Sequence, residues 1–88
     1  MTTNMTTLAL NLLISERRNH RLVFAGKIIE LLQQNSPNSE DEKNRKEDFV
    51  SVIGKCIQNP NCDDRGLFFE YAQYYSDAIH GKTASAMA

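Results

Sequence analysis

Residues 39–60 have the sequence SEDEKNRKEDFVSVIGKCIQNP, which is the clearest helical pattern in the chain. Ser39 and Glu42 form a capping box, in which the serine accepts from first-turn amides and the glutamate reaches back. Three acidic residues in this first turn suit the positive end of a helix dipole. Apolar residues then recur at helical spacing and predict a buried stripe of Phe49, Val50, Ile53, Cys56 and Ile57. Pro60 cannot continue a helix, so we expect this one to end at about Asn59.

Two further helical segments precede this one. Residues 35–38 form a loop, because Pro37 cannot continue a helix and its Asn and Ser neighbours favour turns. Before the loop, apolar residues again recur at helical spacing, at Phe24, Ile28, Leu31 and Leu32. Thr6 or Thr7 can cap a first segment rich in leucine. The polar run 15–21 favours a break near Asn19, and one long helix that changes its packing partner is the alternative.

A last helix follows Pro60. Asp63 or Asp64 can cap it, and we expect it to end at His80 with Gly81 as its stop. No segment alternates polar and apolar residues convincingly enough for a strand. The sequence therefore predicts an all-α fold, a small bundle of three to four helices. We expect a single domain over residues 1–88, with flexible tails at 1–6 and 82–88.

The composition is that of an ordinary globular chain, with 41% hydrophobic residues, 24% charged residues and a net charge of −1. Such a balance gives no general attraction to nucleic acid or to an anionic membrane. The apolar runs fall far short of the ~20 residues that a membrane span needs, and no secretory signal pattern is present. We therefore expect a cytoplasmic protein. Its apolar faces exceed what so small a core can cover, so we also expect a homodimer.

The residues that could carry chemistry do not form a catalytic pattern. His20 and His80 are far apart, and neither has an adjacent serine, cysteine or acid that would form a relay. Cys56 and Cys62 lack the spacing of a redox pair or of a zinc site. We expect no enzyme activity, no cofactor and no metal site, and we expect both cysteines to be dispensable for folding. A loop-closing disulfide, or a metal site that borrows His80 and Asp63, stays open.

Residues 67–75, LFFEYAQYY, contain the candidate interface. Helical spacing predicts a core face made of Phe68, Tyr71, Ala72, Tyr75 and Ile79. Phe69 falls roughly opposite that face, and Leu67 and Tyr74 widen the apolar surface on one flank. Exposed aromatic side chains suit a protein interface, so we expect Leu67, Phe69 and Tyr74 to contact a partner. A further helix that covers Phe69 is the alternative.

The strongest basic patch consists of Arg17, Arg18, Arg21 and Lys27, which could contact phosphates. Few cations and the lack of an interleaved aromatic residue predict a weak, salt-sensitive interaction. The leading functional hypothesis is a small, non-enzymatic helical factor, a regulator, adaptor or chaperone-like protein that acts by binding another protein. The alternative is a dimeric nucleic-acid-binding transcriptional regulator that uses the patch from Arg17 to Lys27.

Overall fold

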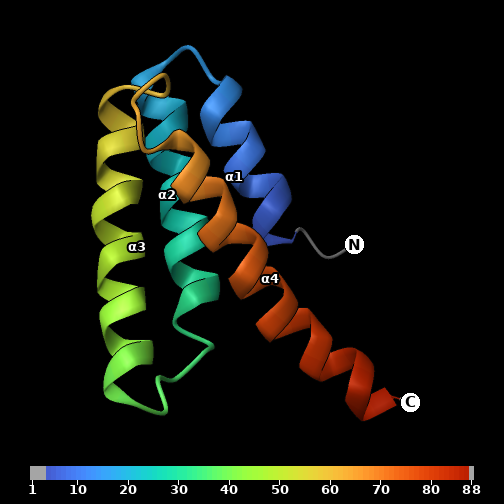
Figure 1. Cartoon of the computed structure of the whole chain (residues 1–88). Coiled ribbons are helices and arrows are strands. Elements are labelled where there is room, and N and C mark those ends of the chain that lie inside the picture. Colours follow the sequence, from blue (N-terminus) through green and yellow to red (C-terminus); the bar gives the residue numbers. More distant parts are fainter. Residues whose placement is uncertain (1–3, 88) are drawn as a thin grey trace.

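The computed structural model describes the backbone of residues 4–87 and the side chains of residues 4–79. Within these residues the chain forms helices and no strand, which confirms the predicted all-α bundle. The helices are α1 (Met5–Ile14), α2 (Arg18–Leu32), α3 (Glu40–Gln58) and α4 (Arg65–Met87) (Figure 1). No helix in the described part of the chain is long and apolar enough to cross a membrane.

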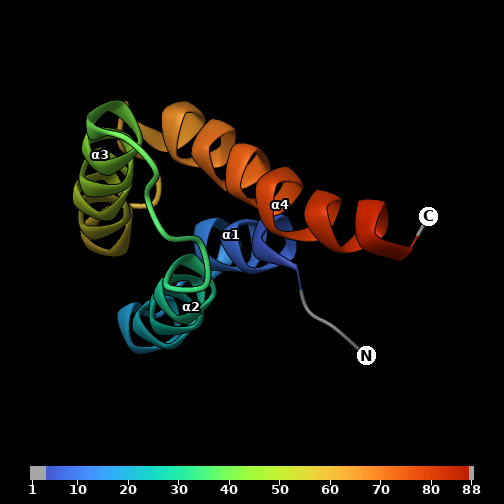
Figure 2. The same cartoon turned by 90° about the horizontal axis from the view of Figure 1, so that it is seen from below.

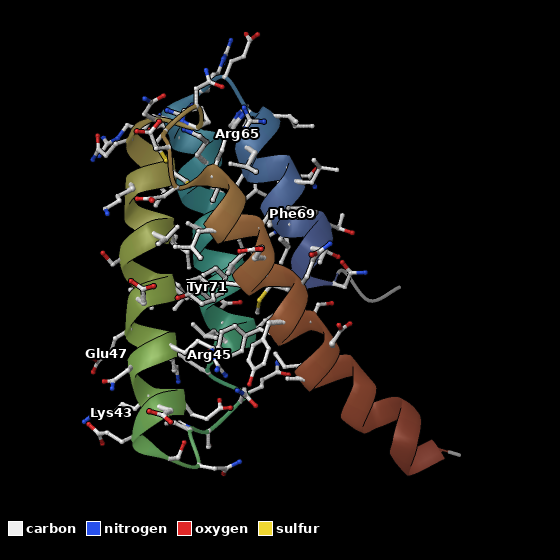
Figure 3. The ribbon with its side chains drawn as sticks, viewed as in Figure 1. Lys43, Arg45, Glu47, Arg65, Phe69 and Tyr71 are labelled. Atoms are coloured by element: carbon white, nitrogen blue, oxygen red, sulfur yellow. The ribbon has the colours of Figure 1, made fainter. Side chains whose placement is uncertain are left out.

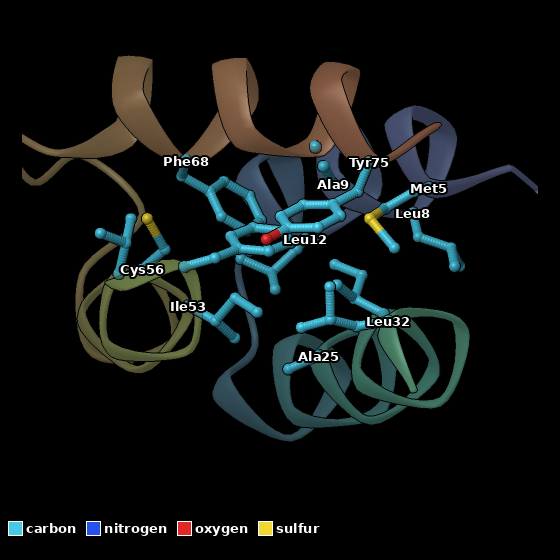
Figure 4. Packing of buried hydrophobic residues seen from close by; sticks show 14 residues of the cluster. Met5, Leu8, Ala9, Leu12, Ala25, Leu32, Ile53, Cys56, Phe68 and Tyr75 are labelled. Atoms are coloured by element: carbon cyan, nitrogen blue, oxygen red, sulfur yellow. The ribbon is translucent and has the colours of Figure 1, made fainter. Parts of the chain in front are cut away.

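The helices form a ring in which α1 packs against both α2 and α4, and α3 closes the ring on the far side (Figure 2). Fourteen buried hydrophobic residues from all four helices make one core (Figure 4). The last turns of α4 project beyond the other helices (Figures 1 and 2). The radius of gyration is accordingly 12.9 Å, slightly above the roughly 12 Å expected for a compact chain of this length.

Helix α1 begins earlier than predicted, because Asn4 rather than Thr6 or Thr7 caps it. The Asn4 Oδ1 atom accepts a hydrogen bond of 2.8 Å from the Thr7 amide, and asparagine is among the best capping residues. Met5 follows directly and is fully buried in the core. The predicted N-terminal tail therefore contains the first turn of a packed helix.

The predicted break between the first two helices is confirmed, although it lies at residues 15–17 rather than at Asn19. Arg21, from the first turn of α2, holds this break together. Its Nη1 atom donates to the carbonyls of Ser15 and Glu16, at 2.9 and 3.0 Å, and its Nε atom donates to Ile57 of α3 at 2.8 Å. One buried guanidinium thus satisfies carbonyls at the C-terminal ends of both α1 and α3, where helix dipoles favour a cation.

Helix α3 begins at its predicted cap, where the Ser39 hydroxyl accepts from the Glu42 amide at 3.2 Å. The Glu42 carboxylate does not complete the capping box, because it turns instead toward α4. The helix ends at Gln58, as predicted. The predicted stripe is wrong at Val50, which is 43% exposed, whereas Val52 is buried. Val52 shares a face with the buried Phe49 through i, i+3 spacing, while Val50 lies about 100° away.

Helix α4 begins at Arg65, where the Asp64 carbonyl accepts from the Phe68 amide at 2.8 Å. The predicted end at His80 is wrong, because the helix continues through Gly81 to Met87. A glycine stop needs a left-handed backbone, and no described glycine has a positive φ. The side chains of His80 and of the predicted tail 82–88 lie outside the described residues.

Candidate interaction surfaces

The aromatic segment of α4 supplies much of the core. Phe68, Ala72 and Tyr75 are fully buried, as the helical spacing predicted, and Tyr71 is half-buried. Their common partner is Phe49 of α3, whose ring stacks on the Tyr75 ring at a centroid distance of 5.4 Å. Phe49 also contacts the rings of Phe68 and Tyr71 at 6.0 and 5.6 Å. These rings join α3 to α4.

The three residues predicted to form one interface do not lie together. Phe69 is half-buried and packs against the core, on the side of α4 that faces α1 (Figure 3). Phe69 is therefore partly covered by the bundle itself and is not fully exposed to a partner. Leu67 is 37% exposed and lies about 160° around the helix from Phe69. The expected patch of Leu67, Phe69 and Tyr74 is thus divided between two flanks of α4.

Tyr74 is 38% exposed, but its polar end is engaged by α3. Its hydroxyl donates a 2.7 Å hydrogen bond to Glu42 Oε1, and the Arg45 guanidinium lies 4.5 Å from the centre of its ring. Arg45 also contacts the Glu42 carboxylate at 3.4 Å. Hydrogen bonding to Glu42 raises the pKa of Tyr74, because the bond favours the protonated phenol. We call the contacts among Tyr74, Glu42 and Arg45 the polar seam. It fixes the outer edge of the α3–α4 contact.

Tyr71 and Tyr75 extend this seam inward. The Tyr71 hydroxyl donates to the Asp48 carboxylate, and this bond raises the pKa of Tyr71. The Tyr75 ring is fully buried, and its hydroxyl has no hydrogen-bond partner among the side chains and backbone that the structure describes. Burial raises the pKa of Tyr75 to about 12, because the phenolate would be poorly solvated. A buried hydroxyl without a partner destabilises the fold by about 1–3 kcal/mol.

The predicted basic patch is also divided. Arg21 is only 7% exposed, and its guanidinium is occupied by the three carbonyls described above. Arg17, Arg18 and Lys27 are exposed. Lys27 lies about 14 Å along α2 from Arg18 and on the opposite face of the helix. Arg17 and Arg18 therefore remain as a pair without the other two cations.

The most exposed large apolar side chains lie on the first two helices, where the sequence reasoning placed no interface. On α1, Leu10 is 50% exposed and Ile14 is 67% exposed. On α2, Val23 is 56% exposed and borders a shallow hollow of about 330 Å³. The hollow is lined by Ser15, His20, Val23 and Phe24, so it adjoins the end of α1. We call Leu10, Ile14, Val23 and the hollow the α1–α2 face.

One sequence feature could have indicated the α1–α2 face. Helix α1 has the sequence MTTLALNLLI and contains no charged residue. Its polar residues are only Thr6, Thr7 and Asn11, and a helix with so few polar groups normally has much of its circumference buried. Among the residues that the structure describes, α2 and α4 cover the face of α1 that carries Met5, Leu8, Ala9 and Leu12, and leave Leu10 and Ile14 exposed. Counting charges in the segment, rather than following the aromatic residues of α4, leads to this surface.

The two cysteines are close together but are not bonded. The Cys56 and Cys62 Sγ atoms are 3.7 Å apart, and both are free thiols. Burial, followed by the contact with Cys62, raises the pKa of Cys56 to about 12. Among residues 4–79, no three His, Cys, Asp or Glu side chains are grouped so as to hold a metal ion.

Comparisons with protein families, with curated protein sequences and with solved structures found no match to this chain. The fold and the surfaces define its class as a small all-α protein of four helices with an uncharged, partly exposed first helix.

Proposed function

We propose that the protein is a non-enzymatic helical interaction factor, which acts by binding another protein chain through the α1–α2 face. We further propose that a second copy of the chain binds this face to form a homodimer, and that the protein works in the cytoplasm. The observation that carries the proposal is the exposure of Leu10 and Ile14 on a helix with no charged residue.

Leu10 and Ile14 are four residues apart, so their side chains are neighbours on one face of α1. The opposite face of the same helix, made by Met5, Leu8, Ala9 and Leu12, is already buried in the core. Burial of a large aliphatic side chain is worth about 1.5–3 kcal/mol. While these two side chains stay in water, that free energy of burial is not gained. A partner that covers them would supply it.

A second copy suits this face on grounds of charge. In a two-fold dimer each surface meets itself, so any charge near the axis opposes its own copy. Helix α1 carries no charge, so the α1 part of the face meets its own copy without that repulsion.

The size of the face supports participation of both helices. A standard interface buries about 800 Å² on each partner, which is about one seventh of the 5721 Å² surface of this chain. Helix α1 is only about 15 Å long, so it cannot supply this area alone. Val23 and the hollow beside Ser15 add apolar surface on α2, next to the end of α1. We therefore place the dimer contact on the α1–α2 face as a whole.

The nucleic-acid hypothesis is less well supported, because Arg21 is buried and Lys27 lies on the opposite face of α2 from Arg18.

Dilution of ¹⁵N-labelled protein, followed by NMR, tests the location of the interface. We expect the amide signals of residues 7–14 and 20–24 to change position or width with concentration, because they lie on the α1–α2 face. The exposed side of α3 around Val50, itself 43% exposed, is the internal control and should not respond. Concentration-dependent changes confined to α3 and α4 would contradict this placement.

A further inference from the structure

Cys56 lies in the last turns of α3, and Cys62 lies in the loop that joins α3 to α4. Their sulfur atoms are 3.7 Å apart, which is van der Waals contact. A disulfide bond of about 2 Å needs the sulfurs to approach by less than 2 Å, a movement within the reach of side-chain rotation. Rotation of their side chains can therefore bring the two sulfurs to bonding distance, which would not be so for two isolated thiols.

Backbone hydrogen bonds of both the Cys62 amide and the Cys62 carbonyl hold this residue in position within the loop. The Cys62 amide donates to the Asn59 carbonyl at 3.0 Å, and the Cys62 carbonyl accepts from the Arg65 amide at 3.2 Å. Across the same loop, Lys55 Nζ contacts Asp64 Oδ2 at 3.0 Å. The folded chain thus keeps the two sulfurs together before any bond forms between them.

The two thiols differ in access. Cys56 is fully buried, whereas Cys62 is half-buried and can be reached from solvent. Burial raises the pKa of Cys56 to about 12, so the thiolate needed for attack is disfavoured at this sulfur in the folded protein. The accessible Cys62 is therefore the first sulfur that an external reagent meets.

We propose that Cys56 and Cys62 form a reversible thiol–disulfide exchange site, whose substrate is a small-molecule disulfide of the glutathione class. The Cys62 thiolate attacks one sulfur of the glutathione disulfide, forms a mixed disulfide and releases one glutathione thiolate. Once Cys62 is in the mixed disulfide, its thiol no longer raises the pKa of Cys56; Cys56 gives its proton to water and attacks the adjacent Cys62 sulfur, and the second glutathione thiolate leaves. In total, two cysteine thiols are oxidised to one disulfide, and one glutathione disulfide is reduced to two glutathione thiols.

The product links the end of α3 to the loop before α4. The bond closes a very short stretch of chain, so the chain-entropy account gives a modest stabilisation of the folded state. We expect the unfolding temperature of the oxidised protein to rise on the order of 10 °C above that of the reduced protein.

The test incubates the folded, full-length protein with mixtures of oxidised and reduced glutathione, and measures intact mass after acid quenching. We expect wild type to lose about 2 Da, the mass of two hydrogen atoms, and to run as a single chain on a non-reducing gel. Peptide mapping should locate the bond between Cys56 and Cys62. Excess reduced glutathione should reverse it.

Two variants separate the steps. Cys56→Ala should stop at the mixed disulfide on Cys62, with the added mass of one glutathionyl group. Cys62→Ser should react only after unfolding in urea, because Cys56 is buried. The proposal is overturned if wild type stops at the mixed disulfide, or if the cysteines of two different chains become linked. Rapid modification of folded Cys62→Ser would overturn the proposed order of attack.

Discussion

Replacing Arg21 with methionine should destabilise the fold far more than the same change at the exposed Arg18. Methionine keeps a long apolar stem but removes the donors that hold the carbonyls of Ser15, Glu16 and Ile57. Each hydrogen bond to a charged group contributes about 1.5–3 kcal/mol. The bonds are only partly buried and water can replace some of them, so we expect a net loss of about 3 kcal/mol.

That loss is large for a chain of this size. Typical stability is about 0.05–0.15 kcal/mol per residue, or roughly 4–13 kcal/mol for 88 residues. Urea denaturation followed by far-UV circular dichroism measures the change as a lower midpoint. Arg18→Met is the matched control, since Arg18 is exposed on the same turn. Arg21→Lys should lie between wild type and Arg21→Met, because it keeps the charge but loses the forked donors. If Arg21→Met is no less stable than Arg18→Met, the capping role of Arg21 is wrong.

Three further predictions concern the buried Tyr75 of α4 and Gly54 of α3. Tyr75→Phe should leave stability at pH 7 unchanged or raise it by about 1 kcal/mol, because it removes a buried hydroxyl that lacks a partner among the described residues. The pKa of Tyr75 is raised to about 12 from the ordinary value near 10, so the folded state binds the phenol proton more tightly than the unfolded state does. The stability that the Tyr75 phenol contributes in this way is complete below pH 10 and is lost as the pH rises through 12. Between pH 8 and pH 11.5, the urea midpoint should therefore fall less for Tyr75→Phe than for wild type. Gly54→Ala should stabilise α3 by about 0.5–1 kcal/mol, since a Cβ at this position meets nothing within 4 Å; an unchanged or lower unfolding temperature would contradict it.

Local sequence patterns predicted the elements well. The Ser39 cap, the stop at Pro60 and the polar run before α2 are signals that act within a few residues of chain. They depend on backbone hydrogen bonds that are made inside the segment itself. The presence of the helices and most of their core-facing residues followed from them. The exceptions are Val50, the cap of α1, the exact place of the break before α2 and the end of α4.

Contacts between distant segments were not predictable in the same way. Phe69 is partly buried against a core built from all four helices, and the guanidinium of Arg21 binds a carbonyl that is 36 residues away in α3. Helical spacing places a side chain on a face but does not identify the neighbour that covers it. For this reason the predicted interface on α4 and the predicted basic patch were both divided by the fold.

The mass of the protein in solution tests the central proposal most directly. Sedimentation equilibrium over a dilution series should show wild type passing from a dimer, twice the 10.0 kDa of the chain, to a monomer. Ile14→Lys removes an aliphatic side chain from each copy and places two cations at the contact. Losing about 1.4 kcal/mol per copy shifts the dissociation constant about a hundredfold, so this variant should be monomeric where wild type is a dimer. Val50→Lys, on α3, should behave like wild type. A wild-type protein that is monomeric at every concentration, or an Ile14→Lys variant that dimerises as well as Val50→Lys, would contradict the proposed homodimer on the α1–α2 face.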